Sequence, residues 1–343
     1  MNIKKRLEQL INHKNLSAPQ MRELIHACMA GELSDSQIAA CLALLRMKGE
    51  TVEELSAAAM VLIELAHKIN LGDGLIDIVG TGGDGINTFN ISTISSFVAA
   101  AAGAKVAKHG ARSVSSQSGS ADLLDKAGFV IELTDEQSKI CLEQCGITFL
   151  YAPHFHQAMQ SVRNARKELR IRTLFNFLGP LINPARVKRS VIGVFSKHWL
   201  KPLAEVLASL GSERVFIINS RDGLDEVSIT EPTEVVEYYQ GEYKSWHIDP
   251  KKYGCYHPSI AKIIVNSPQQ SLDLAEEVLS GKKGEAYDIV LLNSAAALFC
   301  ADLAKDYQEA VEKAKFAIDS GEAARRFEQL KQMTQRLTKG NNE

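Results

Sequence analysis

The 343-residue sequence changes character near residue 71, and this change constrains the fold more than any other feature. Residues 1–70 show only helical patterning, with apolar side chains at spacings of three and four, as in Ile38, Leu42 and Leu45. From the segment LIDIVG onward, short apolar strands alternate with stretches of helix length. Alternation of this kind predicts βαβ units and a mostly parallel sheet covered by helices on both faces. The predicted fold class is therefore α/β, preceded by a small helical unit.

The expected elements follow from local patterns. We expect helices at 3–11, from about 17, from about 34, and at 51–67, 92–102, 121–127, 135–145, 154–169 and 197–210. We expect strands at 75–80, 104–107, 129–133, 147–152, 190–195 and 214–220, an antiparallel meander within 226–248, and a helical tail from 267. These elements divide into a helical domain, residues 1–70, and an α/β domain, residues 71–343. The turn-rich segment at about 160–186 is expected to return to the helical domain.

Composition excludes several classes of protein. The 39 basic and 41 acidic residues nearly cancel, so no global field would hold the chain on nucleic acid or on an anionic membrane. The six cysteines are scattered without a disulfide framework, which favours a reducing compartment. No apolar run approaches the ~20 residues of a membrane span, and the N-terminus lacks the apolar core of a signal peptide. We therefore expect a cytoplasmic protein with no nucleic-acid or membrane partner.

A glycine-rich loop, Gly80-Thr-Gly-Gly-Asp-Gly85, follows the first expected strand. It matches G-x-G-x-x-G, so a dinucleotide site must be considered. Against that interpretation, the helix begins only near Asn90, and the next strand runs into Lys108-His109, where a dinucleotide site requires an acid. Glycine amides and the N-terminus of a helix favour an anion. The loop is therefore interpreted as a phosphate cradle, although such turns are often only tight connections.

Two further segments strengthen this interpretation. The second strand end, beginning at Lys108 and reaching Ser116, brings two cations, a glycine and several hydroxyls into one connection, although a solvated basic loop would look similar. Consecutive parallel strand ends share the carboxyl edge of a sheet, so both loops should face one crevice. Asp225-Glu226 follows a later strand, and adjacent carboxylates near a phosphate site are plausible Mg²⁺ ligands, while alone they are usually solvated. Together these groups suit a diphosphate.

Four motifs in a fixed order carry a family resemblance. They are GTGGDGINTFNIST at 80–93, KHGAR followed by GSAD at 108–122, RTLFNFLGPLINP at 172–184, and GLDE at 223–226. With these motifs, the sequence resembles the anthranilate phosphoribosyltransferase family, whose members transfer phosphoribose from phosphoribosyl diphosphate to anthranilate in tryptophan biosynthesis. The resemblance extends over essentially the whole chain. It implies a nucleoside phosphorylase/phosphoribosyltransferase-like fold, a Mg²⁺ cofactor and a homodimer formed through the helical domain.

The resemblance, taken with the motifs, implies the ligands of each substrate. Phosphoribosyl diphosphate is expected to bind Gly80, Gly83, Asp84, Thr88, Asn90, Ile91, Ser92, Thr93, Lys108, His109, Gly110, Arg112, Ser115, Ser116 and Ser120. Magnesium is expected at Ser92, Asp225 and Glu226, and anthranilate at Gly80, Ala111 and Arg166. A guanidinium such as that of Arg166 suits a carboxylate because its planar fork can donate two parallel hydrogen bonds.

One position departs from the family. The fourth residue of the family's KHGNR motif is an asparagine thought to help bind anthranilate, and Ala111 stands there instead. Loss of a typical hydrogen bond costs roughly 1 kcal/mol, and an unpaired buried partner raises this to ~1 to 3 kcal/mol. We therefore expect weaker acceptor binding by a factor of about ten, with the chemistry retained. A different aromatic acceptor, or another residue supplying the contact, would equally account for the change.

Histidines offer two further candidates. His109 could act as a general base, but the arylamine of anthranilate is already neutral at pH 7, so ordering of the loop or substrate contact is the preferred interpretation and no acid or base is assigned. His154 and His156 could form a metal pair, but no third ligand is evident nearby in the sequence, so they are expected to line or support the pocket.

Three alternative functions stay open at this point. A related phosphoribosyltransferase could use another acceptor. A pyrimidine nucleoside phosphorylase shares a similar phosphate loop, but usually carries a further C-terminal domain and lacks RTLFNFLGPLINP. A non-catalytic nucleic-acid-binding paralogue should show a basic stripe and eroded magnesium ligands, whereas this sequence is near neutral and keeps Asp225-Glu226.

Overall fold

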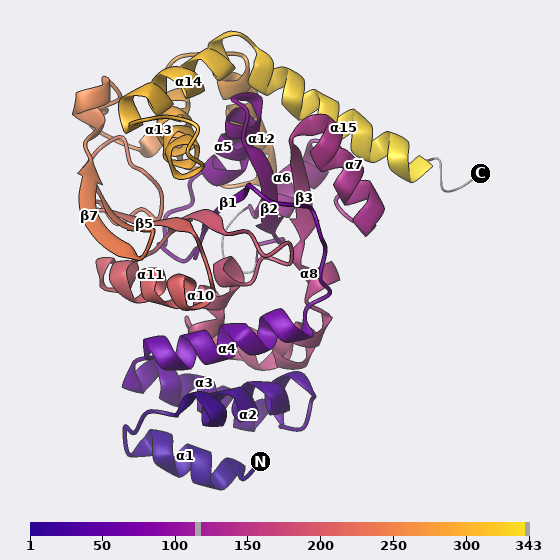
Figure 1. Cartoon of the computed structure of the whole chain (residues 1–343), viewed down its shortest axis with the longest axis vertical. Coiled ribbons are helices and arrows are strands. Elements are labelled where there is room, and N and C mark those ends of the chain that lie inside the picture. The colour runs from indigo at the N-terminus through magenta and orange to yellow at the C-terminus, as the bar shows by residue number, and fades with distance from the viewer. Residues whose placement is uncertain (114–117, 340–343) are drawn as a thin grey trace.

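The computed structural model describes residues 1–113 and 118–339 (Figure 1). Its first four helices are α1 (Ile3–Ile11), α2 (Ala18–Met29), α3 (Asp35–Lys48) and α4 (Val52–Leu65). Their starts follow from capping chemistry, since the side chains of Ser34 and Thr51 accept hydrogen bonds from the amides of Gln37 and Glu54, respectively. The predicted helical start of the chain is confirmed.

A seven-stranded sheet forms the centre of the larger unit. Its strands are β1 (Leu75–Gly80), β2 (Lys105–Gly110), β3 (Ile147–Tyr151), β4 (Arg189–Gly193), β5 (Arg214–Ser220), β6 (Thr233–Tyr239) and β7 (Glu242–Ile248). The order across the sheet is β3-β2-β1-β4-β5-β6-β7. The first five strands in this order are parallel, and β6 and β7 add an antiparallel hairpin at one edge. The predicted mostly parallel α/β sheet is confirmed.

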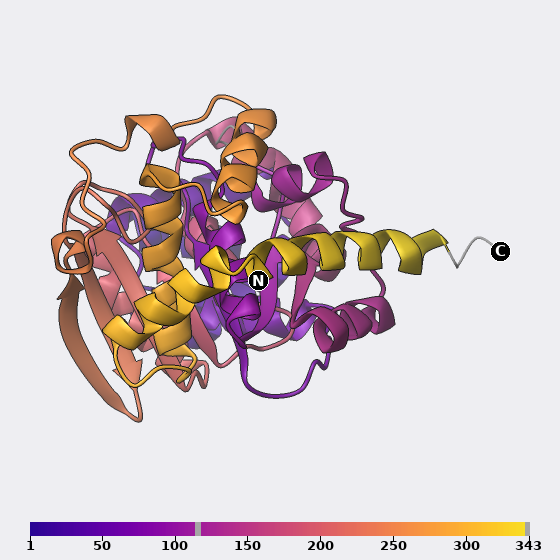
Figure 2. The same ribbon diagram turned by 90° about the horizontal axis from the view of Figure 1, so that it is seen from above.

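The remaining helices cover this sheet and connect its strands. They are α5 (Ile91–Ala101), α6 (Ser120–Lys126), α7 (Asp135–Cys145), α8 (Ala152–Phe155), η1 (Gln157–Val162), α9 (Arg163–Leu169), α10 (Leu174–Leu181), η2 (Lys197–Trp199), α11 (Leu200–Ser209), η3 (Pro250–Tyr253), η4 (Ala261–Ile263), α12 (Pro268–Leu279), α13 (Glu285–Cys300), α14 (Tyr307–Asp319) and α15 (Glu322–Lys339). Figure 1 places α14 and α15 at the end of the molecule opposite α1, and in Figure 2, seen from that end, α15 (yellow) lies in front.

Strand β5 shows how the sheet separates two cores. Phe216 and Ile218 face one core, which includes residues of α5, α13 and α15. Val215 and Ile217 face a second core, which also contains residues of α2, α3 and α4. Alternation of side chains along a strand sends neighbours to opposite faces, so a continuous apolar run is needed where both faces are covered. The N-terminal helices therefore join this second core through α4, which packs against α10 and α11.

The segment between β3 and β4 contributes to the second core. Val162 precedes α9, and Phe177 and Leu178 lie in α10; all three are buried with the apolar side chains of the N-terminal helices. Burial of such side chains stabilises a fold by roughly 1.5 to 3 kcal/mol each. The chain thus leaves the α/β unit after β3, packs against the helical unit, and returns at β4.

Three of the elements expected from the sequence are wrong: the strand at 129–133, the first strand of the meander, and the single helix at 154–169. Residues 129–133 form no strand, although Phe129, Ile131 and Leu133 are buried, because they pack toward helices and the Val130 amide donates to the Thr334 hydroxyl of α15 at 3.1 Å. The meander lacks a strand at 226–230.

The long helix expected at 154–169 is divided into α8, η1 and α9. It breaks at His156, whose φ of −121° and ψ of 55° lie outside the helical region. Among the described helices, none is long and apolar enough to cross a membrane.

Candidate active site

The glycine loop after β1 packs directly on Asp225. A Cβ at Gly80 would lie 2.7 Å from Oδ2 of Asp225, and one at Gly193, at the end of β4, would lie 1.5 Å from its carbonyl oxygen. The Gly82 amide donates to Oδ2 of Asp225 at 2.9 Å, with Gly82 in the left-handed region at φ 63°. Glycine is needed at these positions because a side chain would collide with Asp225 or strain the turn. The strand ends of β1 and β4 and the segment after β5 therefore meet at one point of the carboxyl edge.

Three carboxylates gather at this point. Burial, followed by the charge of the nearby Asp84 carboxylate, raises the pKa of Asp225 to about 7. Loss of solvent and the charge of Asp225 raise the pKa of Glu226 well above its usual value. Burial also raises the pKa of Asp84, although the Ile86 amide, which donates to Asp84 at 2.9 Å, opposes this. Burial disfavours each charge, and repulsion from neighbouring carboxylates adds to this effect for Asp225 and Glu226.

Lys108 is the buried cation beside these acids. It is 3% exposed, and its ammonium donates to the carbonyl of Ile78 at 2.6 Å and to the hydroxyl of Ser92 at 3.4 Å. Burial lowers the pKa of Lys108, whereas Asp77 and Glu226 oppose that change. The ammonium thus lies between β1, the start of α5 and the acidic cluster.

This set of donors fits a divalent cation. Mg²⁺ is bound through one or two carboxylates, with its other positions left to water and substrate phosphates. Asp84, Asp225 and Glu226 supply hard oxygen atoms, and their raised pKa values reflect chiefly the loss of solvent around their charges. The Ser92 hydroxyl lies within reach of the Lys108 ammonium on the same side. A bound cation would relieve the repulsion that the cluster contains.

The start of α5 is fixed by serines from two distant elements. The Asn90 amide group donates to the Ser118 carbonyl at 3.0 Å, and its side-chain oxygen accepts from Ser118 at 2.8 Å and from Ser271 of α12 at 2.7 Å. The Asn90 backbone amide also donates to Ser271 at 3.0 Å. In the described chain, the buried Thr93 hydroxyl has no hydrogen-bond partner. The first turn of α5 therefore presents polar groups next to the glycine loop.

His109 is buried against His156. Their ring centroids are 5.1 Å apart, and the His109 amide donates to the carboxylate of Asp77 at 3.3 Å. Burial, followed by the proximity of His156, lowers the pKa of His109 to about 3. Burial lowers the pKa of His156 to about 4. Both rings are neutral at pH 7, which suits positioning of the loop better than proton abstraction.

Two arginines of the segment after β3 are site candidates, and one of them, Arg172, lies against the glycine loop. The guanidinium of Arg166 lies 5.3 Å from the centre of the Phe175 ring, and burial lowers the pKa of Arg166. No carboxylate pairs with it among the described residues. Arg172 lies over the Phe195 ring at 4.2 Å, and its Nε would be 2.7 Å from a Cβ at Gly83. Arg172 therefore covers the glycine loop, and Arg166 lies in α9 against Phe175 of α10.

A separate cavity of about 640 Å³ lies at the opposite edge of the sheet. It is lined by residues 68–70, 72–75, 184–189 and Glu213, which surround the amino ends of β1, β4 and β5. It contains none of the predicted site residues. Ligands of open α/β sheets bind at the carboxyl edge, so the cluster of acidic and basic residues there, rather than this cavity, is the candidate active site.

Comparisons with known proteins agree with this assignment. The Glycosyl transferase family helical bundle domain matches residues 4–66, and the Glycosyl transferase family a/b domain matches residues 72–324. Anthranilate phosphoribosyltransferase of Legionella pneumophila (strain Paris) is 62% identical over 335 residues, covering 98% of this chain and 97% of the relative. The chain belongs to the anthranilate phosphoribosyltransferase family.

Solved structures of the family share the whole fold. The anthranilate phosphoribosyltransferase of Thermus thermophilus has a TM-score of 0.90 at 36% identity, covering 98% of this chain and all of that one. The Saccharomyces cerevisiae enzyme, solved in complex with PRPP and Mg, has a TM-score of 0.89 at 28% identity, covering 97% and 98% of the two chains. The family resemblance and the fold class are confirmed.

The structure brings most of the family-implied residues to one edge. The end of β1, the first turn of α5 and the end of β2 contain Gly80, Gly83, Asp84, Asn90, Ile91, Ser92, Thr93, Lys108, His109, Gly110 and Ala111. Thr88 pairs in an isolated bridge with Ile264, and Ser120 begins α6, where its hydroxyl donates to the Ala111 carbonyl at 3.4 Å. Ser115 and Ser116 lie outside the described residues.

Arg112 has other partners in this structure. Its guanidinium pairs with Asp122 at 3.3 Å and with Asp125 at 3.0 Å, both in α6, and 47% of its side chain is exposed. The arginine therefore fastens its loop to the helix that follows. A role in phosphate binding stays a prediction for this residue.

Sequence reasoning missed several residues that build the site. Gly193 admits the Asp225 backbone, Ser271 holds Asn90, and Arg172 covers Gly83. Asn293 of α13 binds both the amide and the carbonyl of Val227 at 2.9 Å, which fixes the chain immediately after Glu226. Only Arg172 stood within a recognised motif. The other three are distant in sequence from the residues that they contact, and no local sequence pattern indicates their roles.

Proposed function

We propose that this chain transfers the phosphoribosyl group of 5-phospho-α-D-ribose 1-diphosphate to the amine of anthranilate. The amine nitrogen forms a bond to the anomeric carbon, the bond from that carbon to the diphosphate oxygen breaks, and the nitrogen loses a proton. The products are N-(5-phosphoribosyl)anthranilate and diphosphate. The family supports this assignment, since relatives of this name cover nearly the whole chain.

One observation supports the proposal above the others. Asp225, Glu226 and Lys108 meet at the carboxyl edge of the sheet. Burial raises the pKa of both acids and lowers the pKa of the lysine, so it favours the uncharged form of each. Polar groups rarely remain buried in such surroundings unless a ligand completes them. A metal–diphosphate pair supplies one positive and one negative partner. The metal ion would pair with the acids, and the diphosphate would pair with the lysine.

We assign roles to residues accordingly. Asp225 and Glu226, with Ser92, would hold Mg²⁺, which stabilises negative charge on the departing diphosphate when bound. Lys108 would bind the donor's anionic groups, and the amides of the glycine loop and the first turn of α5 would hold phosphate oxygens. These groups are in place before the donor arrives, so little reorganisation accompanies bond breaking.

The acceptor is assigned to the other side of the crevice. The guanidinium of Arg166, which pairs with no carboxylate among the described residues, matches the carboxylate of anthranilate, and Gly80 and Ala111 would line the position of its ring. No general base is required, because the arylamine is neutral and only needs to be held near the anomeric carbon. His109, neutral and buried, is assigned to positioning the loop after β2.

The decisive experiment follows anthranilate fluorescence with purified protein. We expect the signal to fall only when phosphoribosyl diphosphate and Mg²⁺ are both present, with one diphosphate released per anthranilate consumed. Benzoate, which lacks the amine, should release no diphosphate above the rate without acceptor. Consumption that is independent of the donor, or no consumption at saturating substrates, would contradict the proposal.

We also propose that two copies associate through the helical unit, in a cytoplasmic setting that matches six unpaired cysteines. Ile11 of α1 and Met47 of α3 are 57% and 59% exposed, which supports an apolar contact on these helices. Light scattering should give a dimer for the wild type and a monomer for Met47→Glu. Phe316→Glu, at a residue that is 71% exposed on α14, is the matched control and should stay dimeric.

A further inference from the structure

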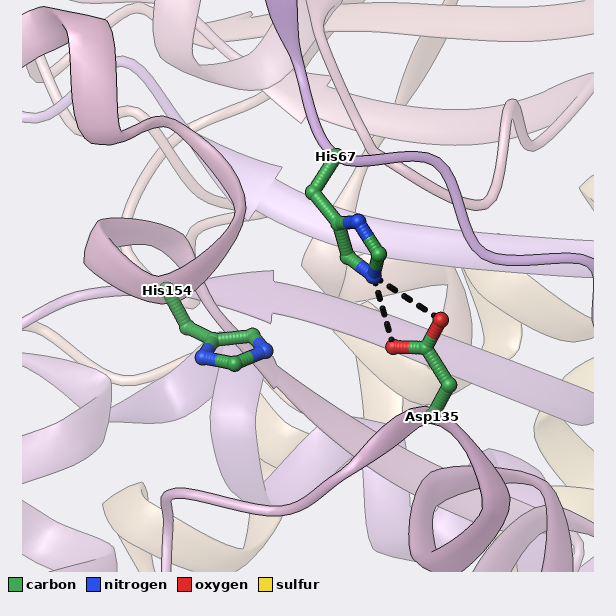
Figure 3. Close-up of side chains that lie close together, drawn as sticks. All are labelled: His67, Asp135 and His154. Carbon is green, nitrogen blue, oxygen red and sulfur yellow. Dashed lines mark hydrogen bonds and ion pairs between the residues drawn. The ribbon is translucent and has the colours of Figure 1, made fainter.

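A cluster of metal-ligating side chains lies outside the active site. His67 follows α4, Asp135 is the first residue of α7, and His154 lies in α8 (Figure 3). The ligand atoms of all three lie within 4.8 Å of one another. The residues are separated by long stretches of sequence, so only the fold reveals them as a set.

The ligand atoms of His67 and Asp135 are already nearly as far apart as two ligands of one metal ion. Nε2 of His67 lies 2.8 Å and 3.0 Å from the two carboxylate oxygens of Asp135. Tetrahedral Zn²⁺ with ligands at about 2.0 to 2.2 Å places its ligand atoms about 3.4 Å apart. Since no two ligand atoms are more than 4.8 Å apart, His154 needs to approach by at most about 1.4 Å to reach that spacing. Rotation of the side chain of an exposed imidazole can supply such a change.

The backbone beneath the cluster is fixed independently of these side chains. The His67 amide donates to the carbonyl of Phe155 at 2.9 Å, which holds the end of the helical unit against α8. Phe155 is 3% exposed, and the His67 ring stacks on it with centroids 5.8 Å apart. The Thr134 side chain accepts from the Gln137 amide and so caps α7 beside Asp135. Ligands on fixed backbone lose little entropy when they bind an ion.

His154 distinguishes this cluster from an ordinary surface ion pair. Within the described residues, neither of its ring nitrogens has a hydrogen-bond partner. Its ring centroid lies 6.0 Å from that of His67, and the two rings are nearly perpendicular (Figure 3). An ion pair alone needs no second imidazole. Two imidazoles and one carboxylate, with solvent at a fourth position, are a donor set typical of Zn²⁺ and related ions, unlike the all-oxygen set expected for Mg²⁺.

We propose that His67, Asp135 and His154 form a binding site for a divalent transition-metal ion such as Zn²⁺. The ion would bridge the chain leaving α4 to α7 and α8, and so fasten the helical unit to the α/β unit. The site is independent of the proposed reaction, because it shares no residue with the acidic cluster or the glycine loop. The cysteines do not compete for the ion, since all six are buried.

The test uses ZnCl₂ titrated into chelator-treated, full-length protein in a calorimeter. With excess Mg²⁺ present to occupy the acidic cluster, we expect one Zn²⁺ site in the wild type, and at least a tenfold loss of its affinity in both His67→Ala and His154→Ala. His247→Ala, at an exposed histidine on β7, is the matched control and should bind Zn²⁺ like the wild type. Asp225→Asn should also retain the site, because it alters only the acidic cluster.

A second measurement guards against an indirect effect of the substitutions. Zn²⁺ should raise the unfolding temperature of the wild type and of His247→Ala, but not of His154→Ala, because a ligand stabilises only the state that binds it. All variants should show the same unfolding temperature without metal to within a few degrees. An identical Zn²⁺ isotherm in His154→Ala and the wild type would overturn the proposal and leave only an exposed ion pair.

Discussion

The two sides of the carboxyl edge bury polar groups in opposite ways. On one side, Asp84, Asp225, Glu226 and Lys108 are groups that normally carry charge, and burial disfavours the charge of each. On the other side, burial lowers the pKa of His109 and of His156, so both pack as neutral rings. This contrast indicates that the side with the acids and the lysine binds charged ligands, whereas the side with the two histidines determines the shape of the pocket. Substitutions on the two sides should therefore have different consequences.

The largest effect is expected on the charged side, in Asp225→Asn. Activity with Mg²⁺ should fall by roughly 10³-fold, equivalent to about 4 kcal/mol of transition-state stabilisation. The free energy of unfolding without Mg²⁺ should rise, because one of three mutually repelling carboxylates is removed while Asn can still accept from the Gly82 amide. Steady-state kinetics and urea unfolding measure the two effects. Glu231→Gln removes an exposed carboxylate from the same segment and should change neither.

Loss of both activity and stability in Asp225→Asn would contradict the comparison. It would mean that Asp225 serves the fold rather than a ligand.

Lys108→Met tests the cationic half of the same side. We expect kcat/KM for phosphoribosyl diphosphate to fall by about 10²-fold, because the buried ammonium next to Ser92 can no longer bind the donor. Lys105→Met alters an exposed lysine at the start of the same strand and serves as the control. An equal loss in both variants would show that strand β2, rather than the charge, is responsible.

The neutral side should make the protein sensitive to acid. An unfolded chain protonates its histidines below about pH 6.5, but folded His156 protonates only near its pKa of about 4. Its contribution to stability is therefore complete above pH 6.5 and is lost as the pH falls toward 4. Between pH 7 and about pH 4.5 this loss is roughly 2 to 3 kcal/mol. Urea unfolding of His156→Asn should show a correspondingly smaller decrease, whereas exposed His247→Asn should match the wild type.

The fold was predictable wherever local pattern and tertiary environment agree. Strands 75–80 and 214–220 are apolar runs buried on both faces, and helix starts at Ser34 and Thr51 carry capping residues. Residues 129–133 have an equally apolar pattern, but their partners are α5 and α15 rather than another strand. The spacing of apolar residues indicates which face of a segment is buried, but not which element covers that face.

The site was predictable where its residues form motifs. The glycine loop, Lys108 and Asp225 were found in this way. Gly193 and Asn293 were not, because each acts by contact with a chain segment more than 30 residues away. His154 lacked a third metal ligand in sequence because His67 and Asp135 reach it only through the fold.

His109→Asn asks whether the neutral side takes part in chemistry. We expect kcat to fall by less than about tenfold and the pH profile of kcat to keep its shape, because a ring with a pKa of about 3 is neutral throughout the working range. His247→Asn is the control for removal of an imidazole. A drop of about 10²-fold or more, with loss of a pH limb, would establish His109 as a general base and overturn the division between the two sides.

The smallest effect is expected at Ala111, where the pocket departs from its family. The Ala111 carbonyl accepts from the Ser120 hydroxyl at 3.4 Å and from the Ala121 amide at 3.2 Å, so the backbone is held while the side chain can be changed. Ala111→Asn should lower KM for anthranilate several-fold with kcat unchanged, since a typical hydrogen bond contributes roughly 1 kcal/mol. Ala111→Val adds bulk without an amide and should give no gain. An unchanged or higher KM in Ala111→Asn would mean that other residues have rebuilt the acceptor pocket around the alanine, and that the neutral side of the edge determines which acceptor fits.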